Sequence, residues 1–318
     1  MIRRSEHFIY IENQFFISSL AGSDVQNTIV SAIMERILLA MEKKETFRVV
    51  VLLPVTPEGD WEKDEAIRHI MLWQQRTIKA FLTQLREKSK ESDDVIAQYV
   101  SFHSLRSFGA LSNGKRVTEQ IYVHSKLIIV DDRLVIVGSA NINDRSMLGD
   151  RDSEICLYIE DSVFEQLSKK NKNKTKQNKN KTLLVVENYD RCVFNGNHYN
   201  VSRFAHSLRV ALWQEHLGLS SKDASVEDPV CADTYELWQV RSSMNTAWFE
   251  AYFPGIPSKR LKTLAQCTAV KGTINPSPPS NISLQGSLVD HPIDFLADEK
   301  HMYITGAAGA AVGADVFV

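Results

Sequence analysis

The sequence predicts an α/β fold in which a mixed β-sheet is flanked by helices. Apolar, β-branched segments alternate with long segments whose apolar residues recur at helical spacing. Several of the short apolar segments are almost uniformly apolar, which is typical of strands that are covered on both faces. Of the 318 residues, 43% are hydrophobic and 9% are aromatic, which is enough to bury a sizeable core.

The first half of the chain supplies most of this fold. Its elements are expected in the order strand, helix, strand, helix, strand, at residues 7–17, 24–44, 47–55, 64–88 and 95–105. Aromatic and β-branched residues crowd the strands. The first strand has a polar break, Glu12 to Gln14, near its end. A buried strand that ends in polar groups often ends at a functional site.

A further strand at residues 121–130 contains two positively charged or ionisable side chains in apolar surroundings. His124 and Lys126 are separated by one residue, and successive side chains of a strand point to opposite faces. We therefore expect the imidazole and the ammonium group on one face of a central strand. A short turn, Asp131 to Arg133, and a second apolar strand follow, so the segment predicts a β-hairpin.

The organisation of the chain changes after residue 165. We expect four parts: an α/β unit at residues 1–165, a Lys/Asn-rich insertion at residues 166–194, a helix at residues 195–222 that returns to the α/β unit, and an irregular C-terminal extension at residues 223–318. Lysine and asparagine in the insertion exclude a packed core. The insertion is interpreted as a solvated segment, with contact to an anionic membrane as the alternative.

Polar groups after the hairpin complete a site suited to a phosphate oxyanion. The turn at Gly138 can present Ser139 and Asn141 as neutral donors, beside Lys126 as a point charge and His124 for proton transfer. Because an acid/base histidine needs its other nitrogen oriented, Glu154 is expected within hydrogen-bond reach of His124.

These residues resemble the HxKxxxxD signature of the phospholipase D superfamily, formed here by His124, Lys126 and Asp131 and followed by GSxN at Gly138 to Asn141. The alternation of side chains places Asp131 on the opposite face from His124, which indicates a structural role at the turn for this third residue. The segments IYIENQFF, IYVHSKL and SRFAHSLR are similar to the eukaryotic branch that hydrolyses phosphatidylcholine. The resemblance covers roughly residues 5–165 and 195–215, and it implies one half of a two-half catalytic fold.

The resemblance implies a mechanism that needs two such motifs. One histidine attacks phosphorus and the other protonates the leaving alcohol and then activates water. This sequence carries one motif and begins where the second half of the family begins. His124 would be the general acid/base, Lys126, Ser139 and Asn141 would bind the phosphate, and a missing N-terminal catalytic half or a second subunit would be the partner. The expected products are phosphatidic acid and choline.

The net charge and the cysteine content argue against several other functional classes. A net charge of -2 argues against a general nucleic-acid binder. The four cysteines show no CxxC or metal-ligand spacing, so no metal site and no cofactor are expected. The sequence shows neither a signal peptide nor a transmembrane span, and we expect a cytoplasmic protein that binds the phospholipid membrane surface peripherally.

Three functional hypotheses stay open at this point. The first is the C-terminal half of a longer phospholipase D. The second is a single-motif phosphodiesterase that supplies both histidines by dimerisation. The third is a non-catalytic remnant that binds lipid phosphate or a partner protein.

Overall fold

The main sheet has eight strands, and they are mixed in direction as expected. The computed structural model describes residues 1–160, 189–277 and 283–299. The strands of the main sheet are β1 (Phe8–Glu12), β2 (Arg48–Leu52), β3 (Val100–Ala110), β4 (Arg116–Gln120), β5 (Leu127–Val130), β6 (Leu134–Gly138), β7 (Cys156–Glu160) and β10 (Leu288–Asp290). Their order is β10-β3-β2-β1-β5-β6-β7, with β4 paired to β3. Strands β1, β2 and β3 are parallel to one another, whereas the other pairings are antiparallel.

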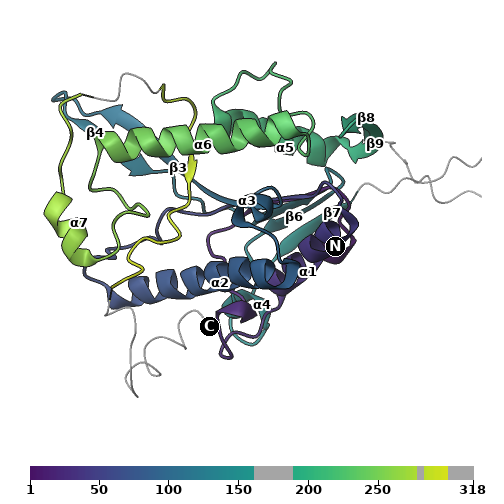
Figure 1. Ribbon diagram of the computed structural model, residues 1–318, viewed down its shortest axis with the longest axis horizontal. Coiled ribbons are helices and arrows are strands. Elements are labelled where there is room, and N and C mark those ends of the chain that lie inside the picture. The colour runs from purple at the N-terminus through teal and green to yellow at the C-terminus, as the bar shows by residue number, and fades with distance from the viewer. Residues whose placement is uncertain (161–188, 278–282, 300–318) are drawn as a thin grey trace, which may run out of the picture.

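Helices cover both faces of this sheet (Figure 1). The helices are α1 (Ile29–Lys43), α2 (Glu65–Ser89), α3 (Asp93–Ile96), α4 (Asp144–Met147), α5 (Arg203–Leu217), α6 (Ala232–Tyr252) and α7 (Leu264–Val270), with 3-10 turns at Ile2–Arg4 and Ser19–Ala21. The long helices predicted within residues 24–44 and 64–88 correspond to α1 and α2. Among the described helices, none combines the length and the apolar character needed to cross a bilayer.

Strand β1 shows why the sheet is covered on both sides. Ile9 and Ile11 pack into a core with α1 and α2, whereas Phe8 and Tyr10 pack into a second core with α5 and α6. All four side chains are buried. The uniform apolar character of the strand follows from this alternation, because each face needs its own apolar residues.

The C-terminal part contributes to both layers of the fold. Helix α6 packs in the second core through Trp238, and β10 pairs with β3 at the edge of the main sheet. Both elements fall in the stretch expected to be an irregular extension. The helical pattern of α6 is obscured because it also buries polar residues, among them Ser242 and Asn245, and β10 has only three residues.

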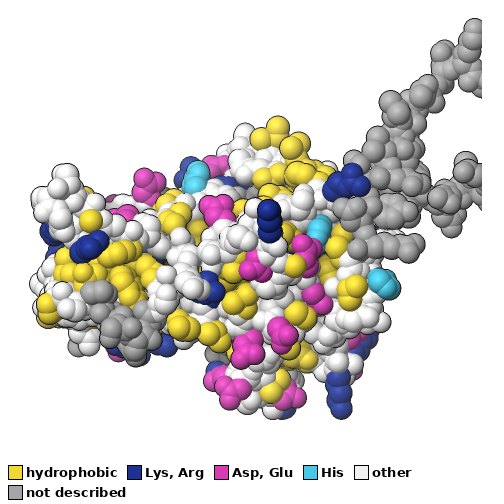
Figure 2. Space-filling model, turned by 90° about the horizontal axis from the view of Figure 1, so that it is seen from above, with side chains coloured by type: hydrophobic (Ala, Val, Ile, Leu, Met, Phe, Trp, Pro, Cys, Tyr) yellow, Lys and Arg dark blue, Asp and Glu magenta, His cyan; other side chains and the backbone are white. Residues whose placement is uncertain are grey.

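A small hairpin precedes α5. Strand β8 (Tyr189–Phe194) pairs with β9 (Asn197–Ser202), so the last residues of the expected insertion are structured. The rest of the Lys/Asn-rich insertion and the glycine-rich tail lie outside the described residues. On the face formed by α5 and α6, acidic and basic side chains are interspersed among polar and apolar ones (Figure 2).

Candidate active site

The segment that carries His124 and Lys126 lies directly before β5, not within a strand as expected. Leu127 pairs with Glu12, the last residue of β1, and β1 does not continue beyond that point. Residues 121–126 therefore have no β1 backbone to pair with, and the strand prediction for 121–130 holds only for 127–130. The catalytic segment, which we define as residues 122–126, leaves the sheet where β1 ends.

Lys126 is held by the Gln14 side chain, which follows β1, and by the backbone of His124. Its ammonium donates to Gln14 Oε1 at 2.9 Å and to the carbonyl oxygen of His124 at 2.6 Å. Gln14 in turn donates to the Tyr122 hydroxyl at 2.9 Å, and the Asn141 amide approaches Gln14 Oε1 at 3.5 Å. Gln14 thus connects the catalytic segment with the GSxN turn. Burial lowers the pKa of Lys126, and the charge of Glu154 opposes this shift.

The GSxN turn is fixed against the end of β1. Asn13 Oδ1 accepts hydrogen bonds from the backbone N–H groups of Phe15 and Ile142, each at 3.2 Å. The Ile17 N–H donates to the Ile142 carbonyl at 2.8 Å. Gly138 is required where β6 meets β7, because a Cβ atom there would overlap the Ile155 carbonyl oxygen. These contacts hold Asn141 near Lys126 through the shared acceptor of Gln14.

Glu154 lies at this site but does not contact His124. Its carboxylate accepts hydrogen bonds from the Ser139 and Ser146 hydroxyls, the latter at 2.6 Å. The expected hydrogen bond to His124 is absent from the described part of the chain. The Ser139 hydroxyl donates to one carboxylate oxygen of Glu154 and the Ser146 hydroxyl donates to the other.

His124 is exposed and only loosely held. In the described residues, its ring has no hydrogen-bond partner, and it stacks on the Tyr122 ring with centroids 6.2 Å apart. An exposed imidazole that is stacked on one side is accessible to a substrate. Its position next to Lys126 places a proton donor beside a fixed positive charge, which is what cleavage of a phosphodiester requires.

Asp131, the third residue of the motif, lies at the far end of β5. Its carboxylate accepts three hydrogen bonds from the N–H groups of Glu6, His7 and Phe8, at 2.7, 2.7 and 2.8 Å. With φ of 54°, it begins a two-residue turn of the kind that joins antiparallel strands. Through these contacts Asp131 anchors β1 as a structural residue at the turn.

A buried polar network lies behind the catalytic segment. The Glu12 carboxylate accepts hydrogen bonds from the Ser125 hydroxyl at 2.6 Å, from the Tyr10 hydroxyl at 2.6 Å and from His216 Nε2 at 3.1 Å. Burial raises the pKa of Glu12, but these donors and the charge of His216 outweigh it, and the net pKa is lowered. The network ties Ser125, between His124 and Lys126, to helix α5.

Sequence reasoning found part of this arrangement. The polar residues Glu12 to Gln14 indicated that the first strand ends at a functional site, although the sequence assigned no role to any of their side chains. His216 was missed, because a single histidine in an amphipathic helix gives no signal until α5 packs against β1. Tyr122 was missed because it was counted as part of a strand.

Helix α5 is also tied to the β5–β6 turn by a buried ion pair. Asp132 and Arg209 are both fully buried, with 2.7 Å between Arg209 Nη2 and Asp132 Oδ2. His206 Nδ1 lies 2.8 Å from the same carboxylate oxygen, and His206 Nε2 lies 2.8 Å from Glu227 Oε2. Both ring nitrogens of His206 thus face carboxylates, which favours the doubly protonated imidazolium.

The same histidine belongs to the one group in the described residues that has the donors for a metal ion. Cys192, His206 and Glu227 place their donor atoms within 4.8 Å of one another. The Cys192 sulfur lies 3.6 and 3.8 Å from the two ring nitrogens, so it lies beside the ring rather than along the lone pair of either nitrogen. The donors are therefore arranged for an ion pair rather than for coordination of a metal ion.

This ion-pair network predicts a pH dependence of stability. Burial lowers the pKa of His206, but the hydrogen bond and the charge of Asp132 outweigh burial, and the net pKa is raised above 6.5. Protonated His206 therefore stabilises the folded state fully below pH 6.5, and this stabilisation is lost as the pH rises through the raised pKa. Urea unfolding should show this decline, and His206→Gln should flatten it. An equal decline in His206→Gln would contradict the assignment.

Comparison with known proteins gives a consistent result. A family model described as Phospholipase D matches residues 1–117 and 84–254. The chain is 40% identical over 278 residues to a phospholipase D of Phytophthora infestans, covering 86% of this chain and 14% of that protein. It is 39% identical to phospholipase D zeta 2 of Arabidopsis thaliana, covering 83% of this chain and 24% of that protein. With phospholipase D2 of Bos taurus it shares 37% identity over 98% of this chain and 32% of that protein. The chain thus spans less than a third of the length of these three relatives.

Proposed function

The chain belongs to the phospholipase D family, and we propose that it supplies the acid/base half of an enzyme that hydrolyses phosphatidylcholine to phosphatidic acid and choline. The observation that carries this proposal is the exposed His124 next to the buried ammonium of Lys126, with Asn141 joined to the same Gln14 acceptor. A phosphodiester bound beside His124 would contact a proton donor and two hydrogen-bond donors for its oxygens, Lys126 and Asn141.

The proposed reaction has two steps that share His124. A histidine of the second half attacks phosphorus, and a phosphorus–nitrogen bond forms while the bond to the choline oxygen breaks. His124 donates its proton to that oxygen. It then removes a proton from water, whose oxygen attacks phosphorus and releases the attacking histidine with phosphatidic acid as the product. Lys126 and Asn141 would stabilise the negative charge on the phosphate oxygens in both steps.

The partner in this proposal is a second catalytic half that carries its own HxKxxxxD motif. The sequence contains one such motif. Beside the site, Ile155, Leu157 and Tyr158 are 78%, 62% and 57% exposed on or next to β7, the last strand of the main sheet. Apolar side chains gathered at a sheet edge are typical of a surface that another element covers. A second half placed there would bring its histidine to the side of Glu154 and Ser139.

The proposed substrate also implies where the protein acts. Phosphatidylcholine is a membrane lipid, so we propose a cytoplasmic enzyme that binds the membrane surface peripherally. The interspersed charges of Figure 2 and the net charge of -2 favour this lipid substrate over nucleic acid.

Trapping the covalent intermediate tests the role of His124. The chain is assembled with a second catalytic half, mixed with phosphatidylcholine labelled on phosphorus, and quenched in alkali, which preserves phosphohistidine. We expect the label on the second half and none on this chain, because His124 transfers protons only. A label on His124 would show that it is the nucleophile and would reverse the assignment.

A further inference from the structure

The buried carboxylate of Glu12 divides its contacts between the protein core and the catalytic segment. One oxygen, Oε1, accepts hydrogen bonds from the Tyr10 hydroxyl at 2.6 Å and from His216 Nε2 at 3.1 Å. The other oxygen, Oε2, accepts from the Ser125 hydroxyl at 2.6 Å. Tyr10 and His216 are buried, whereas Ser125 belongs to the catalytic segment. Oε2 therefore joins the buried network to the candidate active site.

The catalytic segment has few backbone contacts that could hold it in place. Among the described residues, the backbone N–H groups of residues 122–125 form no hydrogen bond to another backbone group. The two residues that flank His124 are instead held by their side chains, because Val123 packs in the second core and Ser125 donates to Glu12. The backbone on one side of His124 thus depends on a single hydrogen bond.

The pairing of Glu12 with His216 is an expensive way to hold a strand against a helix. The two side chains are 7% and 8% exposed. Removing both groups from water costs free energy that their attraction recovers only in part, and apolar residues of similar volume often replace such a pair without loss of stability. What an apolar contact could not supply is an acceptor in a fixed direction for the Ser125 hydroxyl.

We infer that Glu12 is a positioning residue, which acts through Ser125 while His216 holds its carboxylate. The inference rests on the proposed function of His124. The hydrogen bond from Ser125 fixes the backbone between His124 and Lys126, so it determines where the imidazole lies relative to the ammonium group. Misplacing a reacting group by about 1 Å can cost about 100-fold in rate, and supporting hydrogen bonds maintain this precision.

Ser125 is the position where this role can be tested apart from the fold. Substitution of Glu12 would also remove the acceptor of Tyr10 and His216, whereas Ser125→Ala removes only the contact to Oε2. In the assembled enzyme, Ser125→Ala should lower kcat about 10- to 100-fold and leave KM nearly unchanged, because the hydroxyl faces Glu12. Ser125→Thr should recover most of this loss, since threonine keeps a hydroxyl donor.

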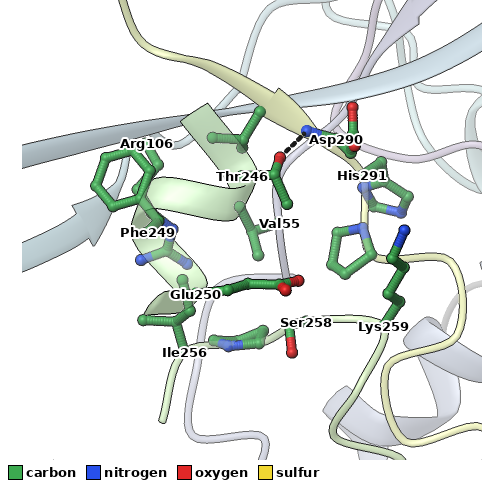
Figure 3. A pocket seen from close by; sticks show the side chains of 13 residues that line it. Val55, Arg106, Thr246, Phe249, Glu250, Ile256, Ser258, Lys259, Asp290 and His291 are labelled. Carbon is green, nitrogen blue, oxygen red and sulfur yellow. Dashed lines mark hydrogen bonds between the residues drawn. The ribbon is translucent and has the colours of Figure 1, made fainter. Parts of the chain in front are cut away.

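Ser242 of α6 offers a matched control for the lost hydrogen bond. Its hydroxyl donates to Asp290 Oδ1 at 2.5 Å, and the Asp290 N–H donates to the Thr246 hydroxyl at 2.7 Å, which Figure 3 shows as a dashed line. None of these residues belongs to the catalytic segment. Ser242→Ala loses the same kind of serine–carboxylate contact as Ser125→Ala, so it should lower the stability and leave kcat unchanged.

Nuclear magnetic resonance of the 318-residue chain reports on His124 without any catalytic reaction. In protein with isotope-labelled histidine, the ring signals of His124 are those lost in His124→Ala. We expect Ser125→Ala to shift and broaden these signals, because the imidazole then samples several positions. Ser125→Thr should restore them, and Ser242→Ala should leave them unchanged.

The two measurements separate this inference from the proposed function. If His124→Ala leaves choline release intact, the proposed function fails, and the ring signals still decide whether Ser125 holds His124. Unchanged ring signals in Ser125→Ala would overturn the inference, as would full kcat of this variant in an enzyme that His124→Ala inactivates. An equal fall of kcat in Ser242→Ala would also overturn it, because the effect would then reflect a general loss of stability.

Discussion

Replacing His124 by alanine in the assembled enzyme should abolish measurable choline release while leaving thermal unfolding unchanged. Loss of a positioned acid/base costs about 10²- to 10⁴-fold in rate, and here one group serves both steps of the reaction. The stability should not change, because His124 is exposed and contacts only the Tyr122 ring in the described part of the chain. Choline release and a calorimetric melt of the same preparation measure the two effects.

His198 offers a matched control for this substitution. It is an exposed histidine in strand β9, within a hairpin that lies apart from the catalytic segment. His198→Ala should keep full activity and the same melting temperature. If His124→Ala retained more than about a tenth of the activity, His124 would not be the acid/base of the reaction.

The second large effect concerns stability. Asp132→Ala should lower the free energy of unfolding by about 3–5 kcal/mol, because it leaves the fully buried guanidinium of Arg209 without its partner. The carboxylate also accepts from Arg209 Nε at 3.0 and 3.1 Å and lies 2.8 Å from His206 Nδ1. Urea unfolding followed by circular dichroism at pH 6 measures this loss.

An exposed ion pair provides the comparison. Asp294 pairs with Lys79 at 2.9 Å, and the two side chains are 47% and 42% exposed. Asp294→Ala should cost less than about 1 kcal/mol, because solvent screens exposed pairs. A loss in Asp132→Ala as small as that in Asp294→Ala would mean that α5 is held to the β5–β6 turn by its apolar contacts alone.

Much of the fold was predictable because apolar periodicity reports burial. Ile9 and Val51 belong to short strands whose central residues are all apolar, and helices cover these strands on both faces. The first residue of the strand predicted at 121–130 was not predictable in the same way. Apolar residues are present as far back as Val123, but β5 begins only at Leu127, because pairing with β1 stops there. The length of the neighbouring strand is not encoded in this segment.

The candidate site, like the fold, was predictable only in part. The spacing of His124, Lys126 and Asn141 indicated the phosphate chemistry, since residue type and order carry it. The orientation of Glu154 depended on Ser139 and Ser146, whose hydroxyls reach it only after the β6–β7 turn has formed. The roles of Glu12 and His216 required α5 to pack on β1, a contact between distant parts of the chain.

Choline release by the purified chain, measured alone and after addition of a second catalytic half, tests the central claim most directly. We expect almost no release by the chain alone at any concentration, and release that saturates when the two halves reach equal amounts. His124→Ala should abolish the restored activity. Robust release by the chain alone, with a rate per chain that does not change with concentration, would contradict the proposal that this chain carries half of the active site.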